Sequence, residues 1–347
     1  MNKKGGARNK KIKAIDEILS AGGFRRARNP NGALVRARAT RDKAESTGKR
    51  ARSKQDAGVH GELEILRPAH WDWPWLVAGF STRRGGESTV FGGHDLNLGL
   101  SEHDPQAVVE KNRRKLLQAL GAAGEELVGM KQIHSDLIHV LRGHNLRGRA
   151  RQALTGDGAV TNAAGLLLSV QTADCVPVLI VDAKKKAVGV FHAGWRGTAK
   201  RIVEKGVGMM RMAFRSDPED MHAAIGPSIG ACCYAVGSEV VDEFQSQFAY
   251  ADKLFSEVFD DDPVKKKYPM LFLTARPPGH SNLGPQAHLD LVEANRRQLI
   301  DAGIGAERIW ASGLCTKCTM ERLFSHRGEG GFTGRMMGLA GIRKQGP

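Results

Sequence analysis

Two apolar, β-rich runs joined by a short polar turn stand in the middle of the chain. The first run is Val176–Val181 and the second is Lys186–His192. Paired runs of this kind predict an antiparallel hairpin. A turn centred after Ala183 places Cys175 directly opposite His192, with Cβ atoms about 5 Å apart. We therefore expect this cysteine and this histidine to lie close enough for one metal ion to bridge them.

Strand-like and helix-like runs alternate over the rest of the chain. The strand-like runs are residues 76–80, 165–170, 176–181, 187–191 and 223–225. Apolar residues recur at helical spacing over residues 104–120, 197–214 and 290–302. Asp104 followed by Pro105 predicts the start of the first helix, and Gly303 predicts the end of the third. This alternation predicts a single mixed α/β domain.

Composition excludes several classes of protein. Of the 347 residues, 41% are hydrophobic, which is enough for a substantial core. No apolar run approaches the roughly 20 residues of a membrane span, and no apolar signal core follows the basic start. The five Cys do not suggest a disulfide framework, so a reducing compartment fits better. We expect a cytoplasmic protein without a membrane partner.

Three short peptides carry two imidazoles and one thiol inside otherwise apolar stretches. They are K-Q-I-H ending at His134, T-A-D-C ending at Cys175 and F-H-A-G-W-R-G around His192. Two His and one Cys form a borderline-soft ligand set that suits zinc, and three protein ligands leave one position open, as in catalytic zinc sites. Spacing alone does not bring His134 to the other two. Taken singly, each of the three residues also fits an ordinary structural role.

Further motifs extend in order from Gly79 to Arg335. They are G-F-S-T-R-R-G-G (79–86), D-L-N-L-G-L (95–100), K-Q-I-H (131–134), G-D-G-A-V-T (156–161), T-A-D-C-V-P-V (172–178), H-A-G-W-R-G (192–197), I-G-P-S-I-G-A-C-C-Y (225–234), F-S-H-R (324–327) and T-G-R (333–335). In this order they resemble the polyphenol oxidase/laccase-domain family, which is also described as purine nucleoside phosphorylases and is related to a peptidoglycan-editing factor. The resemblance implies an α+β fold with layered β-sheets between helices (α/β/β/α), and zinc held by His134, Cys175 and His192.

Other residues of these motifs are candidates for holding substrate. Arg196 lies where the hairpin turns into a helix, and Arg83 precedes a pair of glycines. Either guanidinium can grip a phosphate with paired donors, although a surface ion pair is the alternative for each. Asp174 can orient a ligand imidazole as a hydrogen-bond acceptor. Motif match alone adds the candidates Asn97, Gln132, Ser325, His326 and Arg327.

Four cysteines lie outside this set. Cys315 and Cys318 form a C-x-x-C pair, which can be half of a metal site or a redox pair. A complete structural zinc site needs a second ligand pair, and the chain has no other C-x-x-C. Cys232 and Cys233 are adjacent and are interpreted as packing residues.

Positive charge is concentrated at the start of the chain. Residues 1–54 hold 17 Lys and Arg against 4 Asp and Glu, whereas the rest holds 35 against 33. We expect residues 1–55 to be a disordered basic extension, because they cannot bury enough apolar surface, and residues 56–347 to form the catalytic domain. The extension is either a dispensable tail or misassigned start, an arm for nucleic acid or another anionic surface, or an organellar presequence.

The resemblance implies zinc-dependent purine nucleoside phosphorylase activity on adenosine, inosine or methylthioadenosine, with adenosine deamination at the same metal. Purine nucleosides and phosphate are then the expected partners. In the alternative, Cys175 is a thiolate nucleophile and His192 its base, in an amidase or hydrolase that edits peptidoglycan precursors. None of the 12 His is spaced His-x-His, which disfavours a multicopper polyphenol oxidase, although copper can replace zinc at such a site.

Overall fold

Two β-sheets lie face to face in the part of the chain that the computed structural model describes, residues 62–142, 154–259 and 285–344. The described residues all belong to one unit, Gly58–Pro347. The basic extension predicted for residues 1–55 lies outside them, so its disorder and its boundary stay predictions.

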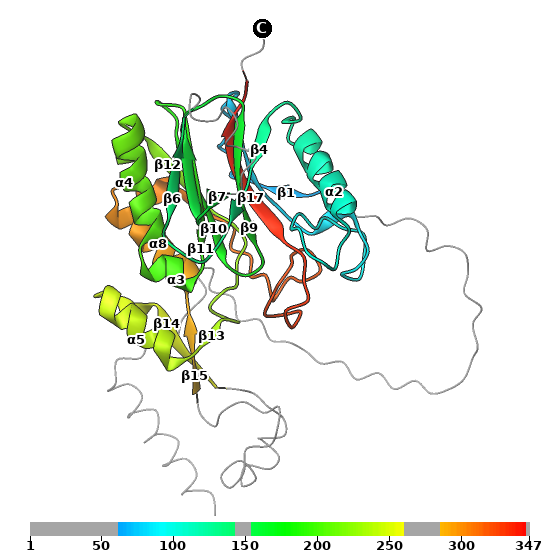
Figure 1. Ribbon diagram of the computed structural model, residues 1–347. Helices are drawn as coiled ribbons and strands as arrows, with labels where there is room; N and C mark the ends of the chain where they lie inside the picture. Colours follow the sequence, from blue (N-terminus) through cyan, green and yellow to red (C-terminus); the bar gives the residue numbers. More distant parts are fainter. Residues whose placement is uncertain (1–61, 143–153, 260–284, 345–347) are drawn as a thin grey trace, which may run out of the picture. The chain divides into compact units, whose positions relative to one another are not determined.

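In the first sheet, the first strand of the described chain lies at one edge and the last strand lies at the centre (Figure 1). Its order is β1 (Ile65–Leu66), β2 (Leu76–Ser81), β17 (Met336–Ile342), β9 (Leu166–Thr172) and β4 (Glu126–Val128). The second sheet contains the hairpin. Its order is β16 (Ile309–Ala311), β12 (Met221–Ile225), β10 (Val176–Asp182), β11 (Ala187–Ala193), β8 (Gly158–Thr161) and β6 (Ile138–Leu141). All five predicted strands are therefore confirmed.

Alternating side chains of the hairpin build two different cores. Val178 and Ile180 of β10 pack against helices, whereas Leu179 and Val181 point into the space between the two sheets. Because successive side chains of a strand point to opposite faces, one fully apolar strand can serve both layers. The predicted α/β/β/α layering is confirmed.

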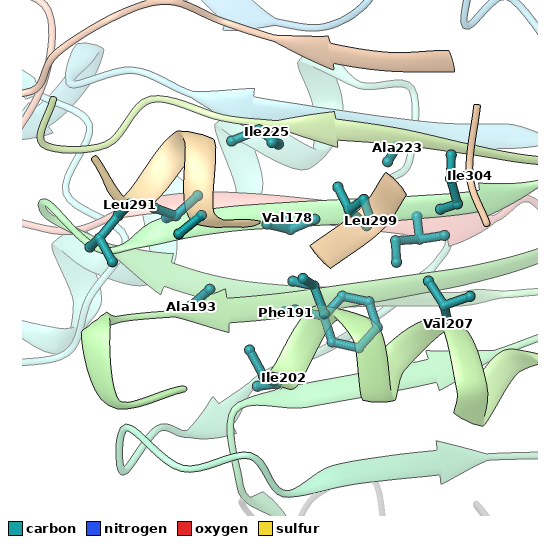
Figure 2. Packing of buried hydrophobic residues seen from close by; sticks show 14 of the residues in the cluster. Val178, Phe191, Ala193, Ile202, Val207, Ala223, Ile225, Leu291, Leu299 and Ile304 are labelled. Atoms are coloured by element: carbon teal, nitrogen blue, oxygen red, sulfur yellow. The ribbon is translucent and has the colours of Figure 1, made fainter. Parts of the chain in front are cut away.

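Helices cover the outer face of each sheet. On the hairpin sheet lie α4 (Ile202–Phe214) and α8 (Leu291–Asp301), while α2 (Gln106–Ala119) covers the other sheet (Figure 1). Figure 2 shows the ring of Phe191, which belongs to β11, next to the helix that carries Ile202 and Val207, namely α4. Gly206 permits this close approach, since a Cβ there would lie 2.4 Å from the buried ring. Full burial of a side chain such as Phe191 contributes about 1.5–3 kcal/mol to folding.

Two details of the predicted helices are wrong. The run 197–214 is not one helix, because Arg201 adopts a left-handed φ of 62° and separates α3 (Trp195–Ala199) from α4. Asp104 does not cap α2; its carboxylate accepts hydrogen bonds from Ser88 and Asn97 instead. The third helix is confirmed, and the Asp290 side chain caps it by accepting from the Glu293 N–H.

Smaller elements complete the described chain. They are the sheet of β13 (Ala235–Val236), β15 (Pro285–Leu289) and β14 (Phe255–Phe259), the pair β5 (Met130–Lys131) and β7 (Leu154–Thr155), strand β3 (Arg84–Ser88), helix α5 (Ser238–Gln247), and the 3₁₀ turns Pro218–Asp220, Ala251–Lys253 and Ala306–Arg308. Within the described ranges, every helix is too short or too polar to span a membrane.

Candidate metal centre and its cavity

The hairpin forms as predicted, but its register differs by two residues. Pro177, not Cys175, lies opposite His192, and the turn covers residues 183–186. The Asp182 side chain accepts hydrogen bonds from the N–H groups of Lys184 and Lys185, and this local turn shifts the pairing toward the second strand. A shift of two residues keeps every side chain on its original face, so Cys175 and His192 still approach diagonally.

The three predicted ligands come together from three separate segments. His134 follows β5, Cys175 precedes β10 and His192 lies in β11, and their ligand atoms are all within 4.8 Å of one another. Nε2 of His134 is 3.8 Å from Sγ of Cys175. Two ligands of one tetrahedral zinc ion at ordinary bond lengths would be about 3.6 Å apart. Gly194 leaves the necessary space, since a Cβ there would lie 3.0 Å from the His134 ring.

Asp157 organises the centre and was not among the predicted site residues. Its carboxylate accepts from Nδ1 of His192 at 2.8 Å, and it also accepts from the N–H groups of Ile133, His134 and Ser135. One buried side chain thus orients the imidazole of one ligand and fixes the backbone of another. Because Nδ1 of His192 donates to this carboxylate, Nε2 is the atom that can bind a metal.

The side chains of Cys175, His192 and Asp157 change one another's pKa values. Burial opposes ionisation of Cys175, but the charge of His192 and the hydrogen bond from His134 outweigh it and lower the pKa of the thiol to about 6. Burial likewise opposes protonation of His192, yet Cys175 and Asp157 raise its pKa to about 9. The pKa of Asp157 is lowered despite its burial, because His192 and Ser135 donate to it. Without a metal, the pair is therefore a thiolate and an imidazolium at neutral pH.

Asp174 does not orient an imidazole as we expected. Its carboxylate accepts from the hydroxyls of Thr316 and Ser325, at 2.6 and 2.7 Å, and from the N–H of Arg327 at 2.6 Å. Its backbone has a left-handed φ of 95°, which is strained for a residue with a side chain. These bonds anchor the turn that presents Cys175, so Asp174 positions the thiol rather than a ring. The imidazole role belongs to Asp157.

Arg83 is held by protein groups on every side. Nε and Nη2 bind the two oxygens of Asp95, each at 2.9 Å, and Nη1 binds Glu329 at 3.0 Å. Nη1 and Nη2 also donate to the carbonyl groups of Met320 and Phe91. The side chain is buried. This arrangement corrects the expected anion clamp, because it leaves Arg83 without a donor for phosphate.

Two further candidates act inside the protein. Asn97 is buried, and its Oδ1 accepts from the N–H of Arg335 at 2.9 Å. Ser325 is also buried, between Asp174 and Glu329. Both side chains therefore position neighbouring segments of the protein.

A cavity of about 620 Å³ opens beside the three candidate ligands. The volume is within the usual range for small-molecule sites. Five other predicted residues line it with the three candidate ligands: Gln132, Asp174, Arg196, His326 and Arg327. Gln132 is itself fixed by the backbone of Gln171, through bonds of 2.7 and 2.8 Å.

The cavity contains polar groups that the sequence did not single out. Arg335 and Tyr234 line it, although both belong to the quoted motifs T-G-R and I-G-P-S-I-G-A-C-C-Y. Burial raises the pKa of Tyr234 to about 12, so the phenol stays a hydrogen-bond donor at neutral pH. Arg196 is exposed and lies over the Trp195 ring at 4.2 Å, and no hydrogen bond to the rest of the described chain engages its guanidinium.

The chain is similar in sequence and in structure to known proteins. The chain is 36% identical over 274 residues to the purine nucleoside phosphorylase YlmD of Geobacillus stearothermophilus, covering 78% of this chain and 91% of that protein. It is 29% identical over 275 residues to the human purine nucleoside phosphorylase LACC1, covering 78% of this chain and 56% of LACC1. The crystal structure of YlmD from Geobacillus stearothermophilus superimposes with a TM-score of 0.65 at 35% identity, covering 81% of this chain and 96% of that chain.

The resemblance drawn from the motifs is thereby confirmed. The sequence model described as multi-copper polyphenol oxidoreductase laccase matches residues 77–343, which include all three candidate ligands, Asp157 and the residues that line the cavity. Since that match covers most of the chain, this protein belongs to the multi-copper polyphenol oxidoreductase laccase family.

Proposed function

We propose that this protein is a zinc-dependent purine nucleoside phosphorylase whose centre is His134, Cys175 and His192. The observation that carries the proposal is the open three-ligand group at the wall of a cavity that also contains arginines. The names of the relatives support the same reaction class, since they are purine nucleoside phosphorylases.

The donor set fits zinc. Two imidazoles and a thiol of lowered pKa offer nitrogen and sulfur ligands, and Asp157 holds His192 in the tautomer that frees Nε2. Bound there, zinc would supply a Lewis acid that polarises a substrate group. No His-x-His pair exists in the sequence, so the several coppers of a multicopper oxidase have no matching ligands. Copper in place of zinc would be a substitution at this one site.

The reaction joins phosphate to the sugar. A phosphate oxygen attacks the anomeric carbon of adenosine, inosine or methylthioadenosine, the bond to the base breaks, and the base leaves with the electron pair and takes up a proton. We assign phosphate binding to Arg196, which lines the cavity, because paired donors match phosphate geometry. Arg327 and Arg335 add positive charge to the same wall. Tyr234, protonated at neutral pH, donates to a substrate oxygen or nitrogen.

Adenosine deamination is a second reaction of the same cavity in this proposal. Water then takes the place of phosphate, adds to the purine carbon that carries the amine, and ammonia leaves. The same ligands and cavity serve both reactions, so both should disappear together in a Cys175→Ala variant.

The alternative hydrolase has one specific observation in its favour. Cys175, His192 and Asp157 are arranged as thiolate, imidazole and carboxylate, which is the order of a nucleophilic triad. A nucleophilic triad does not require His134, whose Nε2 contacts the Cys175 sulfur, whereas a metal centre uses it as a ligand. Iodoacetamide separates the two readings: a metal-bound thiol resists alkylation until a chelator is added, whereas a catalytic thiol reacts at once.

The test of the proposed function is product analysis. Purified protein incubated with adenosine and phosphate should release adenine and ribose 1-phosphate, and adenosine in phosphate-free buffer should yield inosine. If none of the nucleosides is consumed while a peptidoglycan fragment is hydrolysed, the amidase alternative replaces the phosphorylase. A cytoplasmic location and nucleic-acid binding by residues 1–55 remain predictions from the sequence.

A further inference from the structure

A second group of sulfur ligands lies apart from the three-ligand centre. It consists of Cys232, Cys233, Cys315 and Cys318, whose four sulfur atoms are within 4.8 Å of one another. The sequence offered a C-x-x-C without a second pair, and Cys232 and Cys233 were expected to be packing residues. The structure corrects that interpretation, because the two adjacent cysteines are the missing half of the group.

The fold brings the two pairs together through neighbouring parallel strands. β12 and β16 pair in parallel, so the chain leaves both strands at the same edge of the sheet. Beyond that edge, Ser228 and Cys315 form one more parallel bridge, in which the Thr316 N–H donates to the Ser228 carbonyl at 3.0 Å. Cys315 lies in this bridge and Cys318 in the turn after it, while Cys232 and Cys233 lie in the turn that follows Ser228. The juxtaposition is therefore fixed by backbone pairing.

We propose that these four cysteines bind one zinc ion as a tetrahedral thiolate site. Sγ of Cys318 lies 3.5 Å from Sγ of Cys232 and 3.4 Å from Sγ of Cys233. Four sulfurs around one zinc ion are about 3.8 Å apart at ordinary bond lengths. A disulfide needs about 2.05 Å, and packing thiols do not gather four at a time on a partly exposed surface.

Backbone donors already point at one of the sulfurs. The Gly230 N–H donates to Sγ of Cys315 at 3.3 Å. The Cys318 N–H donates to the same sulfur. Donation from N–H groups to a thiolate is the kind of surrounding interaction that supports metal-bound cysteine. A cavity residue, Tyr234, follows this turn and its N–H bonds to Gly230.

A metal ion at this site would stabilise two turns that contact Asp174, next to the proposed catalytic cavity. Thr316, between two of the ligands, donates to Asp174 at 2.6 Å and so anchors the turn that presents Cys175. The Ile229 N–H donates to the Asp174 carbonyl at 2.8 Å from the other side. A metal that joins the two cysteine pairs would hold both contacts in place. Its role would be structural, because all four ligands are protein groups.

Metal counting on the full-length chain tests the proposal independently of the proposed function. Protein purified under reducing conditions and loaded with zinc should hold two zinc ions per chain, as measured by inductively coupled plasma mass spectrometry. Cys175→Ala and Cys318→Ala should each hold one ion, and the double variant none. Lys317→Ala, which removes no ligand from the same turn, should keep both.

X-ray absorption on the Cys175→Ala variant keeps the test valid if Cys318→Ala fails to fold. Its remaining zinc should show four sulfur neighbours at about 2.3 Å. The proposal is overturned if this variant holds no zinc, if the bound metal is iron, or if mass analysis finds a disulfide among these four cysteines in protein isolated without oxidant. Loss of phosphorylase activity without loss of this zinc ion would concern the centre of His134, Cys175 and His192, not the four-cysteine site.

Discussion

The Asp157 carboxylate accepts a 2.8 Å hydrogen bond from Nδ1 of His192, at the bottom of the candidate metal centre. The same carboxylate fixes the backbone that carries His134. One residue thus sets the direction of two ligands, which neither ligand's own motif reveals.

Replacing Asp157 should weaken metal binding without removing a ligand. We expect Asp157→Asn to lower zinc affinity by about 10–100-fold, because groups that orient ligand imidazoles typically have effects of this size. Competition with a zinc-binding dye measures the affinity. Asp136→Asn is the matched control, since Asp136 follows His134 closely in the chain but its carboxylate pairs with Lys205. Equal affinity in the Asp157→Asn variant and the wild type would remove Asp157 from this role.

The thiol of the metal-stripped protein should be unusually acidic. Alkylation of Cys175 by iodoacetamide, followed by peptide mass spectrometry, should rise with pH around a midpoint of about 6, because the thiolate is the reactive form. As His192 has a pKa raised to about 9, the ion pair persists between these two values. His192→Gln removes the charge and should move the midpoint up toward about 8.5. A wild-type midpoint already at that value would contradict the electrostatic account.

Arg83 should matter for stability. Arg83→Met leaves Asp95 and Glu329 partly buried without their partner, and breaking a buried ion pair costs about 3–5 kcal/mol. Urea unfolding measures the free energy of unfolding. Arg84→Met, next in the chain and bonded only weakly to the Glu321 carbonyl, should change it by less than about 0.5 kcal/mol. Similar stabilities for the two variants would refute the structural role of Arg83.

Arg196 should matter for phosphate. Arg196→Ala removes a charge-assisted contact and should raise the KM for phosphate by about 10–100-fold, with little change in the KM for the nucleoside. Arg196→Lys should recover part of the loss, because it restores charge but not paired donors. Steady-state kinetics at varied phosphate gives both constants, with the exposed Arg114→Ala as control. An unchanged phosphate KM would move this role to Arg327 or Arg335.

Much of the fold was predictable because its signals are local. The apolar runs of β10 and β11 needed only their composition, and the third helix needed only its apolar spacing and the glycine, Gly303, that follows it. The register of the hairpin was missed, since it depends on how the Asp182 side chain folds the turn. The side of the sheet on which each side chain lies was nevertheless predicted correctly, because a register shift of two residues does not change it.

The site was predictable only where a family pattern could supply distant contacts. His134 was placed with the other two candidate ligands only by the match to the family motifs. Hydrophobic periodicity does not show that it lies near them. The roles of Asp157, Asp174 and Arg83 depend on which segments meet in space. The four-cysteine group was missed for the same reason, since it needs the parallel pairing of β12 and β16.

Metal-dependent phosphorolysis is the most direct test of the proposed centre. Chromatography should detect adenine and ribose 1-phosphate from adenosine and phosphate with zinc-loaded protein, no product after a chelator, and full recovery on adding zinc back. Cys175→Ala should give no product under any of these conditions. Undiminished phosphorolysis by Cys175→Ala, or by protein shown to hold no metal, would contradict the assignment of His134, Cys175 and His192 as the catalytic metal centre.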